Sequence, residues 1–191
     1  MVGSGDFGGI GLRKRWSRPL PLRVDPTEHR DEIARFRSRI VAGSLVTDCW
    51  VWAGALSDDG YGVFRIRRDG LTRVVRTSRY ALAVALKGRE LAPDVMALHG
   101  GCDNPVCVRV VDFDDMSRGV PAHVVCGDQR ENMIRMARMR RGGGRRAVLA
   151  RGVGVAARVE RSRAIREAVK DGWDGERVAA ALLGSTQPTL W

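Results

Sequence analysis

The 191-residue sequence predicts a small α+β protein. An Asp-Gly turn separates two runs of β-forming residues, over 61–68 and 71–76, which is a strong signal for a type I′ hairpin. Amphipathic helices are predicted as well. An Asp-Pro pair at 25–26 starts one, and Asp128, followed three residues later by Glu131, forms a capping box that starts another. A chain of this length has room for one modest domain with extensions.

The N-terminal part is predicted as a tail followed by a helix. Residues 1–24 combine glycines with arginines and prolines, a composition typical of a flexible basic tail. The helix that follows is expected to run to about Ile40 or Val41. A strand over 49–55, which contains two tryptophans, comes next.

The hairpin is a candidate for contact with nucleic acid. Arg65 and Arg67 share one face of its first strand, because side chains alternate along a strand. Arg73 lies on the returning strand and Arg76 ends it. A two-stranded ribbon with arginines on one side fits a DNA major groove. A solvated sheet face is the alternative interpretation.

A further helix is predicted from residue 77 or 78 to Leu86, with Leu82 and Ala85 facing inward. Arg79 lies in its first turn. A guanidinium there is a candidate for stabilising the charge of a phosphate, and a salt bridge is the alternative. The apolar run over 95–98 then predicts a short buried strand.

His99 follows that strand directly and is the candidate general base. Two glycines come after it, so the backbone can turn sharply and leave the imidazole beside an open loop. Neutral imidazole accepts a proton readily near pH 7. A structural histidine and a zinc ligand are the alternatives.

Cys102 and Cys107 form the most specific candidate metal site. The tight Asn-Pro turn between them folds the second sulfur back toward the first. His123 can add a nitrogen, and either Cys49 or Cys126 can add a third sulfur. A Cys3His set is typical of a closed structural zinc site, whereas buried free thiols are the alternative.

Asn132 falls in the first turn of the helix that the capping box starts. Its carboxamide oxygen is a hard ligand of the kind that Mg²⁺ prefers. Asparagine near a helix start also serves as a local cap, so the residue alone does not distinguish the two roles.

Together these residues resemble one family across residues 30–142. The matching positions are C-W-V-W-A-G at 49–54, Gly60-Tyr61-Gly62, Phe64, Arg79 with its helix, His99, Cys102, Asp103, Asn104, Pro105, Cys107, Val108, His123, Gly127, Gln129, Glu131, Asn132 and Met133. The segment resembles the His-Cys box and related HNH homing endonucleases of phages and mobile elements, which share a ββα-metal (His-Me finger) nuclease core. The resemblance implies that His99 activates water and that Asn132 binds the catalytic Mg²⁺. It also implies structural Zn²⁺ on Cys49, Cys102, Cys107 and His123.

The sequence departs from the family pattern at two places. Two residues rather than one separate His99 from Cys102, and Arg109 replaces an asparagine before a longer acidic loop over 110–122. The expected function is a Mg²⁺-dependent DNA endonuclease. The departures favour the alternative, a non-catalytic zinc-stabilised DNA-binding protein derived from such a nuclease.

The C-terminal part is expected to be separate from the nuclease domain, which spans 25–142. Residues 143–157 are predicted as a basic, glycine-rich linker. Residues 158–191 are predicted as a small helical extension that resembles a helix-turn-helix module.

The overall charge indicates a polyanionic partner. The chain carries a formal net charge of +11, nearly all of its cations are arginines, and no run is long enough to cross a membrane. Double-stranded DNA is the expected partner, and a homodimer is left open. Four cysteines and the absence of an apolar leader favour the cytoplasm.

Overall fold

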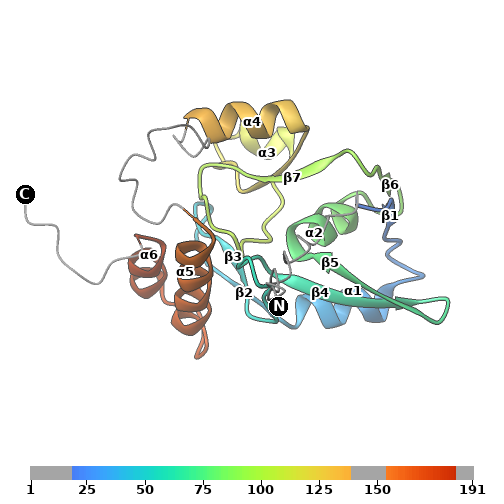
Figure 1. Ribbon diagram of the computed structural model, residues 1–191, viewed down its shortest axis with the longest axis horizontal. Helices are drawn as coiled ribbons and strands as arrows, with labels where there is room; N and C mark the ends of the chain where they lie inside the picture. Colours follow the sequence, from blue (N-terminus) through green and yellow to red (C-terminus); the bar gives the residue numbers. More distant parts are fainter. Residues whose placement is uncertain (1–18, 139–153, 184–191) are drawn as a thin grey trace, which may run out of the picture.

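A computed structural model describes residues 19–138 and 154–183 of the chain. The fold is mixed α+β: the described strands form two-stranded antiparallel sheets, and helices pack around them (Figure 1). The predicted α+β class is therefore confirmed. Most of the predicted basic tail lies outside the described residues, but its end is part of the fold. β1 (Leu22–Arg23) pairs with β6 (Glu90–Leu91), and Leu22 is buried.

The first helix is shorter than the sequence predicts. α1 (Arg30–Arg37) follows a turn in which the Asp25 carboxylate accepts hydrogen bonds from two backbone amides. The chain leaves the helix before Ile40, because β2 (Ile40–Ala42) pairs with β3 (Trp50–Trp52). The prediction that the helix continues to Ile40 or Val41 is wrong, since Ile40 pairs with Trp52 and Val41 with Val51 in a sheet.

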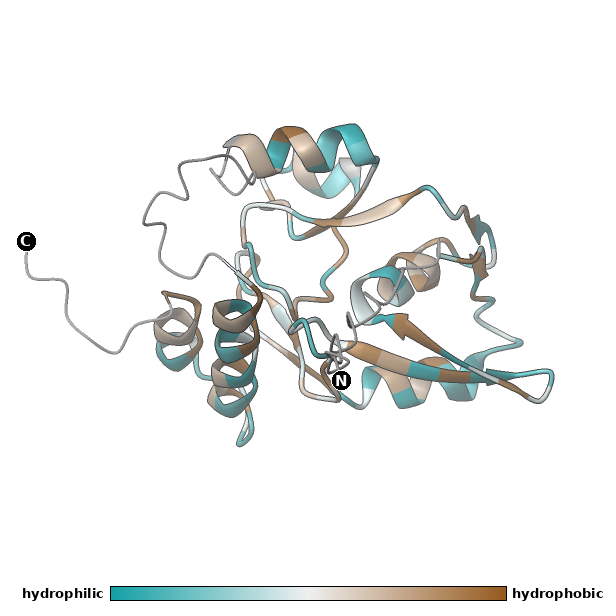
Figure 2. Ribbon diagram, viewed as in Figure 1, coloured by the Kyte–Doolittle hydropathy of each residue, from teal (hydrophilic) through white to brown (hydrophobic). Residues whose placement is uncertain are grey.

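The predicted hairpin is confirmed. β4 (Val63–Arg68) pairs with β5 (Leu71–Arg76), and both turn residues have the positive φ that a type I′ turn requires, 50° at Asp69 and 73° at Gly70. Polar and apolar residues are mixed along this ribbon (Figure 2).

The register of the ribbon corrects the expectation that its arginines share one side. Arg65 lies opposite Val74 and Arg67 opposite Thr72, whereas Arg73 lies opposite Ile66. Residues directly opposite each other project to the same face, so Arg73 is on the other face from Arg65 and Arg67.

The main core lies between the ribbon, α1 and α2 (Thr77–Ala85). Four aromatic rings meet there, with centroid separations of 4.6–5.7 Å: Phe36, Trp52, Phe64 and Tyr80. Leu82 is buried as expected, but Ala85 is exposed, because the buried residues of α2 run from Thr77 to Ala83.

A second layer begins with the strand that ends at His99. β7 (Met96–His99) pairs with β8 (Val124–Gly127), and α4 (Gln129–Arg138) follows directly. The capping box is confirmed: the Glu131 amide donates to the Asp128 carboxylate at 2.7 Å, and the Asp128 amide donates to the Glu131 carboxylate at 2.8 Å. The acidic loop between the strands contains the short helix α3 (Phe113–Ser117).

The C-terminal helices pack against this body. α5 (Val155–Ala168) and α6 (Gly175–Leu183) contact each other, and α5 lies against β3 (Figure 1). α5 begins inside the segment predicted as linker. The end of the helical extension predicted for 158–191, from residue 184 on, lies outside the described residues. Among the helices that the structure describes, none is both long and apolar enough to span a membrane.

Candidate functional site

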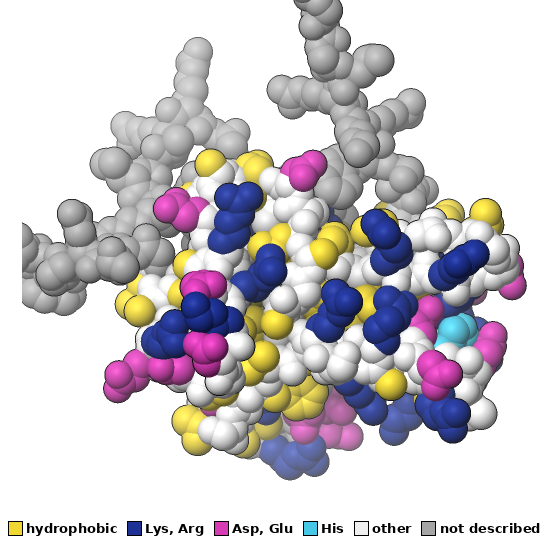
Figure 3. Space-filling view, turned by 90° about the horizontal axis from the view of Figure 1, so that it is seen from below, with side chains coloured by type: hydrophobic (Ala, Val, Ile, Leu, Met, Phe, Trp, Pro, Cys, Tyr) yellow, Lys and Arg dark blue, Asp and Glu magenta, His cyan; other side chains and the backbone are white. Residues whose placement is uncertain are grey.

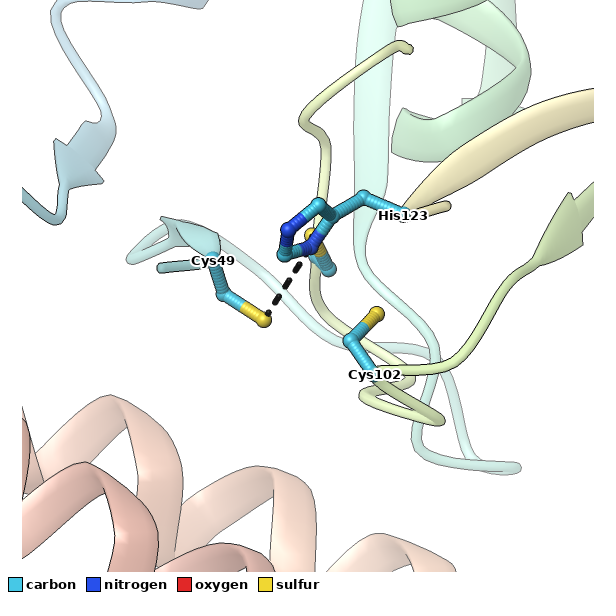
Figure 4. A group of neighbouring side chains, drawn as sticks. Cys49, Cys102 and His123 are labelled. Atoms are coloured by element: carbon cyan, nitrogen blue, oxygen red, sulfur yellow. Dashed lines mark hydrogen bonds between the residues drawn. The ribbon is translucent and has the colours of Figure 1, made fainter. Parts of the chain in front are cut away.

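Four potential metal ligands converge from three separate segments (Figure 4). Cys49 directly precedes β3, His123 directly precedes β8, and Cys102 and Cys107 flank the Asn-Pro turn after β7. Cys126 is exposed and is not part of the group. The third sulfur, which the sequence left open between Cys49 and Cys126, therefore comes from Cys49.

The spacing of the four ligand atoms suits a tetrahedral ion. All four lie within 4.8 Å of one another, and the Nδ1 atom of His123 lies 3.7 Å from the sulfurs of Cys49 and Cys107. Zinc at about 2.3 Å from sulfur and about 2.0 Å from nitrogen would place neighbouring ligand atoms roughly 3.5–3.8 Å apart. Cys49, Cys107 and His123 are also buried. The donor set and its burial fit a structural zinc-type site.

The thiols perturb one another strongly. Hydrogen bonds from Cys107 and Cys49 hold the pKa of Cys102 well below its usual range. The hydrogen bond with Cys102 raises the pKa of Cys49 to about 12, and burial raises that of Cys107. A bound cation would allow the three thiols to be ionised together, because it stabilises the thiolate form of each ligand.

The loop between Cys102 and Cys107 is shaped by a buried asparagine. The Asn104 side chain is fully buried, and its Oδ1 accepts a hydrogen bond from the Val106 amide at 3.0 Å. The Cys107 amide donates to the Asn104 carbonyl at 3.1 Å. The loop is then tied to β3, since the Trp52 amide donates to the Val106 carbonyl at 2.9 Å. These bonds place Cys107 close to Cys49.

Arg109, one of the positions where the sequence departs from the pattern that it resembles, stabilises the same region. Its Nη1 donates to the carbonyl oxygens of Leu45 at 3.0 Å and Asp48 at 2.7 Å. Its guanidinium also lies 5.7 Å from the ring centroid of Trp50. Arg109 therefore holds in place the segment that leads into Cys49, which is a structural role for this arginine.

A cavity of about 500 Å³ is lined by both His99 and Asn132, and by Asp103 of the cysteine loop. His99 comes from the end of β7 and Asn132 from the first turn of α4. Both ring nitrogens of His99 are buried and form no hydrogen bond of ordinary geometry among the described residues, but the imidazole is close enough to Cys102 to contribute to the lowered pKa of that thiol. The ring stacks on Tyr61 at 6.3 Å between centroids. His99 is therefore a buried polar side chain at the wall of the cavity, next to the cysteine loop.

The charge of this cavity is positive. The described residues around it include one aspartate, Asp103, and four arginines, Arg76, Arg135, Arg158 and Arg161. Arg76 was expected to contact DNA from the ribbon. Arg135, Arg158 and Arg161 were not singled out from the sequence. Arg158 and Arg161 are three positions apart, and this spacing was the one sequence feature that could have placed them on the same face of a helix.

Arg79 is not brought to this cavity. Its guanidinium donates to the backbone carbonyls of Val95, Leu20, Leu91 and Ala92, and the residue is 8% exposed. Burial lowers the pKa of Arg79 from its usual value. These bonds join α2 to the segment that precedes β7. Arg79 therefore has a structural role, and its burial is explained without a salt bridge.

The other ribbon arginines, Arg65, Arg67 and Arg73, are exposed and lie outside the cavity lining. Figure 3 shows that basic side chains are spread over the face seen from below and are interspersed with acidic and apolar ones. Comparisons with protein-family models, curated proteins and solved structures returned no match to this chain.

Proposed function

We propose that this protein is a metal-dependent endonuclease of the HNH and His-Cys box type that hydrolyses a DNA phosphodiester. One observation carries the proposal: His99 and Asn132, predicted as base and metal ligand, line the same cavity although 33 positions separate them in the sequence. The strand–strand–helix order of β7, β8 and α4 supports a ββα-metal core.

Two residues of the cavity offer oxygen ligands to a hard divalent ion. The amide oxygen of Asn132 and the carboxylate of Asp103 are oxygen donors that Mg²⁺ accepts, and both residues line the cavity. When bound, such an ion neutralises charge on the scissile phosphate and on the leaving oxygen. The imidazole is too soft a ligand to be the first choice for Mg²⁺, which leaves His99 for proton transfer.

His99 is assigned the role of general base. Its imidazole lines the cavity and, in the neutral form, can accept a proton from a water molecule that attacks phosphorus. Stacking on Tyr61 restricts the rotation of the ring and so maintains its direction. The zinc-type cluster takes no part in the chemistry. It joins the segments before and after the loop that follows His99.

The test is nicking of supercoiled plasmid DNA in Mg²⁺. We expect His99→Ala and Asn132→Ala each to lower the cleavage rate by about 10²-fold or more, the usual effect of removing an acid–base group, while duplex binding persists. His29→Asn is the matched control. His29 is remote from the cavity, and the asparagine keeps an acceptor for the Asp25 amide.

Two results would decide against catalysis. The wild-type protein could bind DNA without nicking it in any divalent metal, as a zinc-stabilised DNA-binding protein would. Alternatively, nicking could survive in His99→Ala at the rate of the control, which would remove His99 from the mechanism.

A further inference from the structure

Helix α5 is fixed against the cavity rather than appended to the domain. Ile165 and Ser162 are fully buried. At Gly60, a Cβ atom would lie 2.9 Å from the backbone of Val159, so α5 approaches the 57–60 turn at backbone contact. The Nε of Arg158 donates to the Asp59 carbonyl at 2.7 Å across this junction.

The docking of α5 brings two of its arginines to the cavity. Arg158 and Arg161, three residues apart on one face of the helix, both line it. Arg161 lies 3.7 Å from the carboxylate of Asp103, in the loop between the cluster cysteines. Arg163, on the same helix, is exposed and does not line this cavity.

Arg158 forms a pair with Arg76 around Tyr61. The guanidinium carbons of Arg76 and Arg158 lie 4.1 Å and 4.9 Å from the centroid of the Tyr61 ring. The same ring stacks on His99. Asp59 holds both arginines, accepting from Arg76 with its carboxylate at 2.6 Å and from Arg158 with its carbonyl.

Both guanidinium groups of this pair line the cavity together with Arg135 and Arg161, whereas one described carboxylate, that of Asp103, lines it. The lining therefore makes the cavity positive, and an anion is the ligand that such a site favours. Guanidinium groups bind phosphate oxygens through paired donors and do not bind metal ions, which makes a phosphate the fitting ligand.

We propose that α5 completes the nuclease site and that Arg158, paired with Arg76 on Tyr61, binds a backbone phosphate of the DNA next to His99. This inference rests on the proposed function for the identity of the substrate. It makes the C-terminal helix pair part of the site, and it makes Arg158 a substrate-binding residue supplied from outside the strand–strand–helix unit.

The test compares Arg158→Ala with Arg163→Ala, which removes the same charge from the same helix outside the cavity. Binding of a labelled DNA duplex is measured against salt concentration in Ca²⁺, and single-turnover nicking is measured in Mg²⁺. We expect Arg158→Ala to lower the salt slope by about one and to lower the nicking rate by about 10- to 100-fold. Arg163→Ala should leave the nicking rate unchanged.

Arg158→Lys is the control for a folding defect, because lysine keeps the charge but cannot form two parallel hydrogen bonds to a phosphate. It should melt like the wild-type protein and still nick more slowly. Equal behaviour of Arg158→Ala and Arg163→Ala in both assays would overturn the inference. If the wild-type protein never nicks DNA, the proposed function fails, and the salt slopes alone still decide whether Arg158 binds a phosphate.

Discussion

Cys107 and Cys49 lie in the interior of the folded chain. Val51 and Val106, close to them in sequence, are fully buried, and His123, whose Nδ1 atom faces the sulfurs, is 1% exposed. Polar groups at this depth are costly unless they are bound. A cation shared by the three sulfurs and the imidazole removes part of that cost, so metal content and core stability should be linked.

Replacing one ligand should therefore cost both metal and stability. We expect Cys102→Ser to lose most of the bound zinc and to lower the free energy of unfolding by on the order of 4 kcal/mol, the range associated with losing a structural metal. Zinc per chain is measured by atomic emission, and stability by denaturant unfolding. Cys126→Ser, an exposed thiol outside the cluster, is the control. Unchanged zinc in Cys102→Ser would contradict the ligand assignment.

At the scale of elements, the two faces of the β4–β5 ribbon have different surroundings. Phe64 and Ile66 face the core, while Arg65 and Arg67 project from the opposite side and are exposed. Arg73 lies directly opposite the buried Ile66, on the same face, but its own side chain is exposed. A DNA duplex that contacts the outer face of the ribbon should meet Arg65 and Arg67 and should not meet Arg73.

Single substitutions on the two faces test which face of the β4–β5 ribbon contacts DNA. Arg67→Ala should weaken duplex binding and lower the salt slope by about one, because one phosphate contact is lost. Arg73→Ala removes the same charge from the same ribbon and should leave the slope unchanged. Fluorescence anisotropy at several salt concentrations measures both. The reverse order of effects would show that DNA binds the other face.

At the scale of the whole molecule, the C-terminal helices share the core of the N-terminal part. Ile165, Val169 and Val178 belong to the same buried cluster as Trp52 and Tyr80. The residues that these helices bury are therefore expected to stabilise the entire chain. A module with its own core, as the sequence suggested for residues 158–191, would unfold separately.

Ile165→Ala tests this shared core. The side chain is fully buried, so its truncation should lower the free energy of unfolding by about 2–5 kcal/mol, in one transition that includes the signal of the buried Trp52. Exposed Arg163→Ala should change it by less than about 0.5 kcal/mol. Two separate transitions, with only one of them shifted by Ile165→Ala, would mean that α5 and α6 fold independently.

The sequence by itself determined the local features of this fold. The type I′ turn at Asp69-Gly70 depends on which residues tolerate positive φ, and the capping box depends on hydrogen bonds between residues three apart. The strand that ends at His99 was visible as an apolar run. Such features are encoded in neighbouring residues, so a pattern in the sequence is sufficient to predict them.

Tertiary structure alone decided how these parts meet. Three features join segments that are distant in the chain. They are the position of Cys49, rather than Cys126, in the cysteine cluster, the hydrogen bonds of Arg79 to backbone carbonyls, and the position of Arg158 in the cavity that His99 also lines. Which distant segments pack together depends on burial of apolar surface over the whole molecule, and no local spacing records it. For this reason the sequence could propose His99 and Asn132 as candidates for a base and a metal ligand, whereas it did not single out Arg135, Arg158 and Arg161, which line the same cavity.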